Sequence, residues 1–469
     1  MRIDIRAKSI SDFPKDRLCD CENPISMIED CMNKRFAVVG LGGRSNMYVD
    51  ALSSTHSEYG TLSAFCDINR TRMNYYNNIL QEKYNADPIP EYTPDRFEEM
   101  LDAEHIDTVI VTTIDRTHHR YIIRAMDAGR DAVTEKPMTI DAEKCAAIYE
   151  AIERTGRNLK VTFNYRYTPR STRVKELLME GVIGDVKSVH FEWLLDTRHG
   201  ADYFRRWHRD KRNSGGLMVH KATHHFDLIN WFLGSRPHQV FGMGQLAYYG
   251  RENAEERGVL EFYDRGTNNP IAAKDPFALD LSQEKQLSEL YLKAEHDDGY
   301  RRDQSVFGDG ISIEDDMAVL VQYESGATMS YHLTAYSPWE GYRIAFNGTE
   351  GRLEYELQET SYVSGADEDK NQPEIRNSAT FEINEPYRIL VRRHWTEPVD
   401  VRVEASDEGG HGGGDIRLLD HLFKGATDDP LGHAADHRDG ASSILTGISA
   451  NRSFEIRRPV YVKDIFPYW

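Results

Sequence analysis

The chain has 469 residues, of which 39% are apolar, and a formal net charge of −20 at pH 7. This length is enough for one or two globular cores, and no apolar run reaches the ~18 residues that a membrane-spanning helix needs. Because the net charge is negative and the basic residues are dispersed, the chain repels nucleic acid. We therefore predict neither a nucleic-acid partner nor a membrane partner.

Residues 1–33 are predicted to form an N-terminal extension to which we assign no function. The segment is polar and lacks the charged start and apolar stretch of a secretory signal. The cysteines are odd in number and lack the spacing of a disulfide framework or a zinc site, so we expect reduced thiols and a cytoplasmic protein. These cysteines are Cys19, Cys21, Cys31, Cys66 and Cys145.

The first regular elements are a strand over residues 36–39 and a helix over 46–54, joined by a glycine turn. Glycines let this turn bring backbone N–H groups against a pyrophosphate, at a helix N-terminus that favours negative charge. Ser45 stands where a third glycine is usual, so an ordinary turn is the alternative. The predicted cofactor contacts here are Gly40, Gly42, Gly43, Arg44 and Ser45.

A second predicted strand, residues 62–66, ends in Asp67. Its carboxylate follows the turn by about twenty residues, the spacing at which an acidic side chain binds the ribose diol of a dinucleotide. A carboxylate there repels a 2′-phosphate, so we predict NAD as the cofactor. Arg70 lies nearby and would favour such a phosphate, which keeps NADP as the alternative.

Two further βα units follow at the expected spacing, with strands over residues 107–112 and 131–134 and a helix over 117–128. The second of these strands delivers Glu135-Lys136-Pro137 at its carboxyl end, where ligands of open parallel sheets bind. An isolated Glu-Lys-Pro tripeptide is otherwise a solvated ion pair before a helix-starting proline. The predicted cofactor contacts in these units are Thr112, His118, Glu135 and Lys136.

From about Lys34 to the C-terminus the chain resembles the glucose-fructose oxidoreductase, inositol dehydrogenase and rhizopine-catabolism (Gfo/Idh/MocA) family. The resemblance implies an NAD-dependent oxidoreductase with an α/β Rossmann domain followed by an α+β domain that has a large, mostly antiparallel open sheet. It rests on the order and spacing of several elements. These are the glycine turn after Val38-Val39, Cys66-Asp67, His118 ahead of Ala128-Gly129, Glu135-Lys136-Pro137, Gly181-Val182-Ile183-Gly184, and Ser214-Gly215-Gly216 leading to His224 and Asp227.

We place the Rossmann domain at residues 34–156 and the substrate and oligomerisation domain at 157–469. Residues 251–312 are predicted to be an insertion that forms a lid or an oligomer contact, and its acidic cluster at 295–298 is predicted to be solvated. A further exposed loop is expected at 365–372. The second domain should contain helices over 168–179 and 223–233 and strands over 186–195, 240–249, 317–323, 327–331, 344–347 and 352–357.

The resemblance implies catalytic roles for Lys136 and His224. An alcohol loses a proton as its carbon gives up hydride, so a histidine with a pKa near neutrality can act as the base. An ammonium group at the same oxygen stabilises the developing alkoxide. Asp227 is expected to share a helix face with His224 and to fix its tautomer, and the alternative is a surface carboxylate.

The sequence departs from the family pattern at His220, because an aspartate usually stands four residues before the catalytic histidine. Three explanations are open: a changed proton relay, a larger or more anionic substrate bound with the help of Lys221, or a metal held by His220 and His224. We predict no metal, because no further ligand is identifiable nearby. His225 is expected to be structural.

Arginine and aromatic side chains near these motifs suit sugar hydroxyls and ring faces. A glycine-rich turn over 409–415 precedes a predicted helix over 416–424 and can bring His411 or Asp415 to a ligand, unless Asp415 only caps the helix. The predicted substrate contacts are Arg166, Tyr167, Trp207, His220, Lys221, His224, Asp227 and His411.

Together these features predict an NAD-dependent oxidoreductase that acts on a secondary alcohol of a sugar, cyclitol or glycoside. We expect it to be a homo-oligomer, either a dimer or a tetramer. The first alternative is an NAD-dependent glycoside hydrolase that oxidises its sugar transiently. The second is a non-catalytic sensor of NAD and sugar, against which the presence of both Lys136 and His224 argues.

Overall fold

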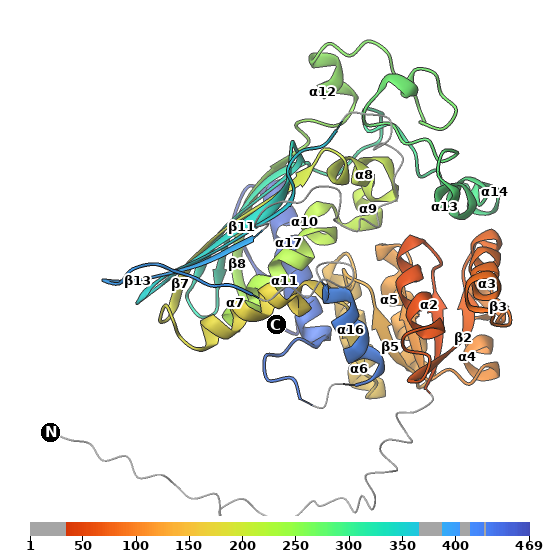
Figure 1. Ribbon diagram of the computed structural model, residues 1–469, viewed down its shortest axis with the longest axis horizontal. Helices are drawn as coiled ribbons and strands as arrows, with labels where there is room; N and C mark the ends of the chain where they lie inside the picture. The colour runs from red at the N-terminus through yellow and green to blue at the C-terminus, as the bar shows by residue number, and fades with distance from the viewer. Residues whose placement is uncertain (1–33, 365–386, 404–412, 426–427) are drawn as a thin grey trace, which may run out of the picture.

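The structure is a computed structural model that describes residues 34–364, 387–403, 413–425 and 428–469. It contains two sheets, and each is covered by helices on at least one face (Figure 1). In the described part of the chain, no helix has the length and apolar character needed to cross a membrane.

The first sheet has seven strands in the order β15-β6-β5-β4-β1-β2-β3 and confirms the predicted Rossmann fold. All neighbouring pairs are parallel except β15 with β6, and the strand order reverses between β1 and β4. The strands are β1 (Lys34–Val39), β2 (Gly60–Cys66), β3 (Glu91–Tyr92), β4 (Thr108–Val111), β5 (Asp131–Thr134), β6 (Leu159–Val161) and β15 (Ala435–Asp436). The helices beside them are α2 (Asn46–Ser53), α3 (Arg70–Tyr84), α4 (Phe97–Ala103), α5 (His118–Asp127) and α6 (Ala142–Thr155).

The central strands of this sheet are apolar throughout because helices cover both of its faces. All four residues of β4 are buried, as are the last four of β1. Gly40 follows β1 with φ +91°, and a Cβ at this position would lie 2.6 Å from the Thr113 backbone. Only glycine fits there, which fixes the start of the turn.

The second sheet has nine strands in the order β14-β13-β12-β11-β7-β10-β9-β8-β16. Its neighbouring pairs are antiparallel except β7 with β10, as predicted for a mostly antiparallel sheet. The strands are β7 (Val186–Asp196), β8 (Pro237–Gln245), β9 (Asp316–Tyr323), β10 (Thr328–Ser337), β11 (Glu340–Gly348), β12 (Gly351–Thr360), β13 (Tyr387–Arg393), β14 (Val399–Asp400) and β16 (Val460–Tyr461).

One face of this sheet is buried and the other is open, because buried and exposed residues alternate along the strands. Helices lie against the buried face, between the two sheets in Figure 1. They are α7 (Pro169–Met179), α10 (Leu217–His220), α11 (Ala222–Leu233) and the long α17 (His437–Ile456). The helices therefore bring the buried face of the second sheet to the ligand-binding edge of the first.

The chain leaves the second sheet between β8 and β9 and crosses to the first domain. This excursion contains α12 (Arg251–Glu256), η6 (Ala272–Lys274), α13 (Lys285–Leu287), η7 (Ser288–Leu292) and α14 (Glu295–Asp298), and α13 and α14 lie beside α3 (Figure 1).

The acidic cluster at residues 295–298 is partly solvated, with Asp297 exposed, but its three carboxylates have partners in the protein. Asp297 Oδ2 accepts the backbone N–H of Thr71 at 2.8 Å, and Asp298 pairs with Arg72 at 2.8 Å. Glu295 pairs with Arg265 at 2.6 Å. The partners of these carboxylates are two arginines and the first turn of α3, which lie far from residues 295–298 in the sequence.

Candidate active site

The predicted cofactor residues meet at one edge of the first sheet. The glycine turn follows β1, Asp67 follows β2, and Glu135-Lys136-Pro137 follows β5. Ligands of open parallel sheets bind outside the carboxyl ends of the strands, next to the position where the strand order reverses. Here that position lies between β1 and β4.

The glycine turn is a cradle of the shape that a pyrophosphate requires. A Cβ on Gly42 or Gly43 would have only the Tyr291 hydroxyl nearby, at 3.9 and 3.1 Å. The Gly43 N–H donates to that hydroxyl at 2.8 Å. Thr112 braces the turn by donating to the Gly40 carbonyl at 2.5 Å, and Ser45 donates to the Gly42 carbonyl at 2.7 Å. An anionic group bound at this turn would take the Gly43 N–H in place of the Tyr291 hydroxyl.

Asp67 is buried at the end of β2 and is bound to the turn itself. Its Oδ2 accepts the Leu41 N–H at 2.5 Å, and its Oδ1 accepts the Asn69 N–H at 2.8 Å. Burial raises the pKa of this carboxyl, and the two backbone donors oppose that rise. Each carboxylate oxygen keeps a second lone pair with which it can accept from a ribose hydroxyl.

Glu135 and Arg44 are bonded to each other. Glu135 Oε1 accepts from Arg44 Nε at 2.6 Å and from the Tyr48 hydroxyl at 2.7 Å. Arg44 also lies 3.8 Å from Asp415. The pair fixes the loop that carries Lys136 against the helix of the glycine turn.

His118 joins the loops that follow β4 and β5. Its Nδ1 lies 2.8 Å from the Pro137 carbonyl and its Nε2 lies 2.9 Å from the Thr113 carbonyl. Burial lowers the pKa of this imidazole. In this structure His118 therefore positions the loops on either side of the cleft, because both ring nitrogens contact the backbone.

Lys136 reaches from the first domain to the second. Its Nζ donates to the His220 carbonyl at 3.4 Å. Burial lowers the pKa of Lys136 to about 8, and the carboxylates of Asp115 and Glu135 oppose this shift. The ammonium is therefore still the main form at neutral pH, but it titrates far below an ordinary lysine.

Three of the predicted residues, His220, Lys221 and His224, are buried at the junction of α10 and α11. The His224 ring lies 4.8 Å from the ring of Tyr165, and the Lys221 ammonium lies 4.9 Å from the centre of the Trp193 ring.

His225 is a core residue, as predicted. Its ring stacks on Trp193 at 3.8 Å, and its Nδ1 lies 2.6 Å from the Tyr331 hydroxyl.

A carboxylate absent from the predicted set binds His220. Asp115 Oδ2 lies 2.5 Å from His220 Nδ1, and both residues are buried. Asp115 begins η3 (Asp115–Thr117), just after β4. Its place at the carboxyl end of a parallel strand was a signal in the sequence that could have identified it.

Aromatic rings enclose His220. The ring of His208 lies 4.2 Å away, that of Tyr203 lies 5.5 Å away and that of Trp207 lies 5.8 Å away. They come from α8 (His199–Arg205) and η5 (Trp207–Arg209). The predicted residue Trp207 is thus beside His220.

Arg166 and Asp227 do not have the expected positions. Arg166 donates to both carboxylate oxygens of Asp227, at 2.8 and 2.5 Å, and lies 3.0 Å from Asp439. The Arg166 side chain is only 2% exposed. Burial raises the pKa of Asp227 to about 7, against the pull of Arg166. The Asp227 carboxylate thus belongs to a buried ion pair and does not orient His224.

Tyr167 also points away from this centre and packs against His421 and His433, at 5.8 and 5.2 Å. Its neighbour Tyr165, in the same turn η4 (Asn164–Tyr167), contacts His224 instead. The turn that the sequence singled out therefore brings Tyr165, and not Tyr167, next to His224.

His411 lies outside the described residues. Asp415, in the first turn of α16 (Gly414–Phe423), accepts from Asn164 Nδ2 at 2.7 Å. The residue that caps this helix is Gly413, which has no side chain, so Asp415 is not the N-cap. Asp415 connects α16 to the turn that carries Tyr165.

Within the described ranges, no three His, Cys, Asp or Glu side chains are grouped so that they could hold a metal ion. His220 and His224 do lie one helical turn apart, but Nδ1 of His220 is occupied by Asp115.

Two family models match the chain. A model described as the NAD-binding Rossmann fold of the Gfo/Idh/MocA oxidoreductase family matches residues 34–163. A model described as the C-terminal alpha/beta domain of this family matches residues 175–462.

Three proteins illustrate the similarity. YteT of Bacillus subtilis strain 168, whose name classes it as an oxidoreductase, is 34% identical over 453 residues, which are 92% of this chain and 99% of YteT. Inositol 2-dehydrogenase of Rhizobium meliloti strain 1021 is 32% identical over 138 residues, which are 29% of this chain and 40% of that enzyme. The crystal structure of the WlbA dehydrogenase from Bordetella pertussis, in complex with NADH and UDP-GlcNAcA, matches 92% of this chain and 98% of its own at 17% identity, with a TM-score of 0.57. This last similarity is one of fold.

Proposed function

The chain belongs to the Gfo/Idh/MocA oxidoreductase family, and from this premise we propose that it oxidises a secondary alcohol of a sugar, cyclitol or glycoside with NAD. The observation that carries the proposal is the contact of Lys136 Nζ with the His220 carbonyl, because it joins the cofactor edge of the first sheet to the α10–α11 junction. We place the reacting alcohol at this junction, between the ammonium group of Lys136 and the imidazole of His224.

Lys136 and His224 have complementary tasks in this proposal. Oxidation of an alcohol to a ketone removes hydride from carbon and a proton from oxygen. When bound, the nicotinamide supplies the acceptor of the hydride. His224 accepts the hydroxyl proton, and the Lys136 ammonium stabilises the negative charge that develops on the oxygen. Because both side chains are shielded from solvent, the electrostatic interaction is stronger than it would be in water.

Asp67 supports NAD over NADP. Its carboxylate is at the end of β2, where the adenine ribose of a bound dinucleotide would lie, and it is buried. A phosphate at that position would meet a negative charge, whereas a hydroxyl would meet a hydrogen-bond acceptor.

The substrate side of the cleft suits a polyhydroxylated ring. The aromatic ring of Tyr165 lies beside His224, and that of Trp207 lies beside His220. Lys221 adds a hydrogen-bond donor. Aromatic faces pack against the C–H faces of sugars, while charged and polar groups bind their hydroxyls. Sugars, inositols and aryl glycosides are therefore the compounds to test.

The experiment is a screen of the purified protein against these compounds while NADH absorbance is followed. We expect NADH to accumulate with at least one secondary alcohol. If the purified, folded protein binds NAD but reduces no NAD with any of these compounds, a non-catalytic sensor of NAD and sugar becomes the better account.

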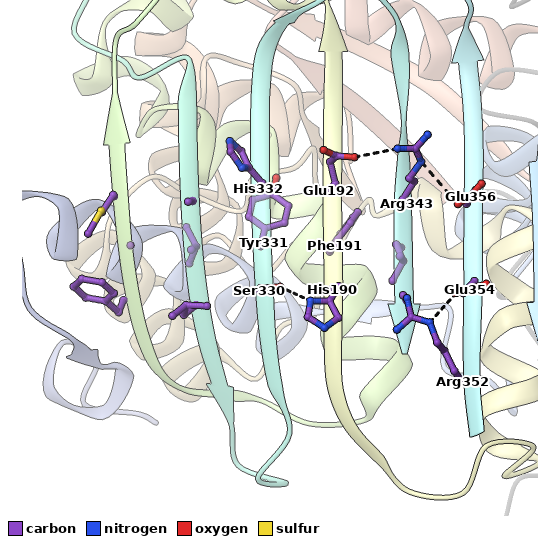
Figure 2. A pocket seen from close by; sticks show the side chains of 18 residues that line it. His190, Phe191, Glu192, Ser330, Tyr331, His332, Arg343, Arg352, Glu354 and Glu356 are labelled. Atoms are coloured by element: carbon purple, nitrogen blue, oxygen red, sulfur yellow. Dashed lines mark hydrogen bonds and ion pairs between the residues drawn. The ribbon is translucent and has the colours of Figure 1, made fainter. Parts of the chain in front are cut away.

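We also propose that the open face of the second sheet is covered by a second copy of the chain. The face has a hollow of about 610 Å³ (Figure 2). Its charged side chains pair among themselves, such as Glu192 with Arg343, while Met243 and Leu320 are 66% and 58% exposed.

Light scattering of the purified protein should show a dimer or tetramer, and Leu320→Asp should shift the protein toward the monomer. The control Met179→Asp, 57% exposed at the end of α7, should not. A monomeric parent protein would contradict the proposal.

A further inference from the structure

Asp115 lies where it can position the groups of the candidate active site. It comes from the first domain, yet its carboxylate is bonded to Nδ1 of His220 from the second domain at 2.5 Å. Lys136, which donates to the His220 carbonyl at 3.4 Å, is the charge that acts most strongly on the Asp115 carboxylate. Asp115 and His220 are buried and Lys136 is half-buried, and the three form one group at the junction of the two domains.

This arrangement explains how the chain can have His220 at the position where the family motif usually has an aspartate. The substrate-domain motif has a histidine where an aspartate is usual, so the motif itself supplies no carboxylate to the lysine. We propose that Asp115 is the carboxylate of this centre, a positioning residue that keeps Lys136 charged and holds His220 as its Nδ1–H tautomer. The inference rests on the proposed function, because Lys136 is the residue whose charge is used there.

The physical reason is mutual compensation. Burial raises the pKa of Asp115 and lowers the pKa of Lys136, and each of these charges opposes the shift of the other. Each charge therefore favours the ionised form of the other group. An ionised Asp115 accepts the Nδ1–H of His220, which leaves Nε2 of that ring as a hydrogen-bond acceptor in the cleft.

Other charged groups face this trio and contribute to its titration. Arg206 acts on Asp115 and on His220, and burial lowers the pKa of His220 well below its usual value. The groups that act on Lys136 are Asp115, Glu135, Lys221 and Arg44, and those that act on His220 are Lys136, His208, Arg206 and His224.

Lysine labelled with ¹³C at Cε gives a test that needs no substrate. The Lys136 signal, assigned as the one lost in Lys136→Arg, should titrate at about pH 8 in the parent protein. In Asp115→Asn the midpoint should fall by about one to three pH units, the usual effect of removing one adjacent charge. The double variant Asp115→Asn/His220→Asp, which returns a carboxylate to the motif, should move the midpoint back up.

Asp429→Asn is the matched control, because Asp429 pairs with Nδ1 of His433 at 2.9 Å outside the cleft. This variant should leave the Lys136 midpoint unchanged. An unchanged midpoint in folded Asp115→Asn would overturn the inference. Should that variant fail to fold, Asp115→Asn/His220→Asn is compared with His220→Asn: a lower Lys136 midpoint in the double variant supports the inference, and equal midpoints overturn it. Neither result depends on whether an alcohol is oxidised.

A second, independent inference concerns residues 285–302, which we call the strap. Three contacts hold it to the start of α3, directly after Asp67. Asn69 Nδ2 donates to the Ala294 carbonyl at 2.8 Å, the Thr71 N–H donates to Asp297 at 2.8 Å, and Arg72 pairs with Asp298 at 2.8 Å. The strap therefore covers the end of the cleft where Asp67 would bind the adenine ribose.

Tyr291 extends from the strap to the glycine turn. Its hydroxyl accepts the Gly43 N–H, and the guanidinium groups of Arg72 and Arg302 lie 5.7 and 4.7 Å from its ring. A pyrophosphate bound at this turn takes the same N–H. We infer that Tyr291 competes with the cofactor for this donor, so that its hydroxyl must release the Gly43 N–H before the cofactor can bind.

Stopped-flow fluorescence with NADH tests this inference. Tyr291→Phe removes the competing hydroxyl, and NADH should associate about two- to tenfold faster, the effect expected of one hydrogen bond. Tyr300→Phe is the matched control, since its ring also lies 5.7 Å from Arg72 while the Gly43 N–H donates to Tyr291. Equal association rates in the parent protein and Tyr291→Phe would overturn the inference. A parent protein that binds no NADH at all would instead contradict the proposed function.

Discussion

The two ends of the cleft are built in opposite ways. At the end near Lys136, buried titratable groups from both domains face one another, and several of their pKa values are displaced by burial. At the end near Asp67, backbone donors, a tyrosine hydroxyl and a buried ion pair satisfy one another, and the strap closes over them. Perturbed titratable groups are typical of catalysis, whereas satisfied polar contacts are typical of binding. Substitutions at the first end should therefore change turnover, and those at the second should change cofactor affinity.

The largest effect is expected at the first end. Lys136→Ala and His224→Ala should each lower turnover about a hundred- to ten-thousand-fold, the contribution of a positioned acid or base. Because neither side chain belongs to the glycine turn, both variants should still fold and bind NAD. Near-parent turnover in either variant, measured with the alcohol found in the screen, would remove that residue from the mechanism.

The second end is tested by Asp67→Ser. Loss of the carboxylate should narrow the preference for NAD over NADP by about 1 to 3 kcal/mol, the scale of a charge-assisted hydrogen bond. Calorimetric titration of both cofactors measures this difference. Ser63→Ala, a change at a buried residue of the same strand, serves as the control and should leave the preference intact. Equal affinities of the parent protein for the two cofactors would show that Asp67 does not select between them.

The smallest expected effect is that of a chelator. If His220 is held by Asp115 and serves no metal, exhaustive chelation should leave turnover unchanged, and elemental analysis should find no stoichiometric zinc or manganese. Turnover that is lost on chelation and regained with one of these ions would make His220 and His224 ligands. That outcome would also mean that the chemistry at the end of the cleft near Lys136 depends on a metal ion.

The parts of the molecule that local patterns encode could be predicted from the sequence. The alternation of polar and apolar residues along strands such as β9 predicted the second sheet, and the apolar run of β4 predicted the first. The glycine turn and the Glu-Lys-Pro motif could be predicted because their function depends on neighbours in the chain. A resemblance to a known family then connected these motifs with His224.

The remaining features depend on contacts between distant segments. Asp115 meets His220 across 105 residues, and Gly43 meets Tyr291 across 248. No local periodicity encodes such a pair. Arg166 was predicted to contact the substrate because arginine suits sugar hydroxyls, but its partner Asp227 lies 61 residues away. The pairing of a buried charge is decided by the packing of the folded chain.

The central claim is that the hydride removed from the substrate stays on the cofactor, so that an oxidised product and NADH are both released. The direct measurement offers sugars, inositols and p-nitrophenyl glycosides with NAD and counts NADH, oxidised product and nitrophenolate in the same reaction. The account predicts oxidised product and NADH in equal amounts, with no nitrophenolate released beyond the background. Many turnovers of nitrophenolate without net NADH would contradict it and would establish glycoside hydrolysis by transient oxidation instead.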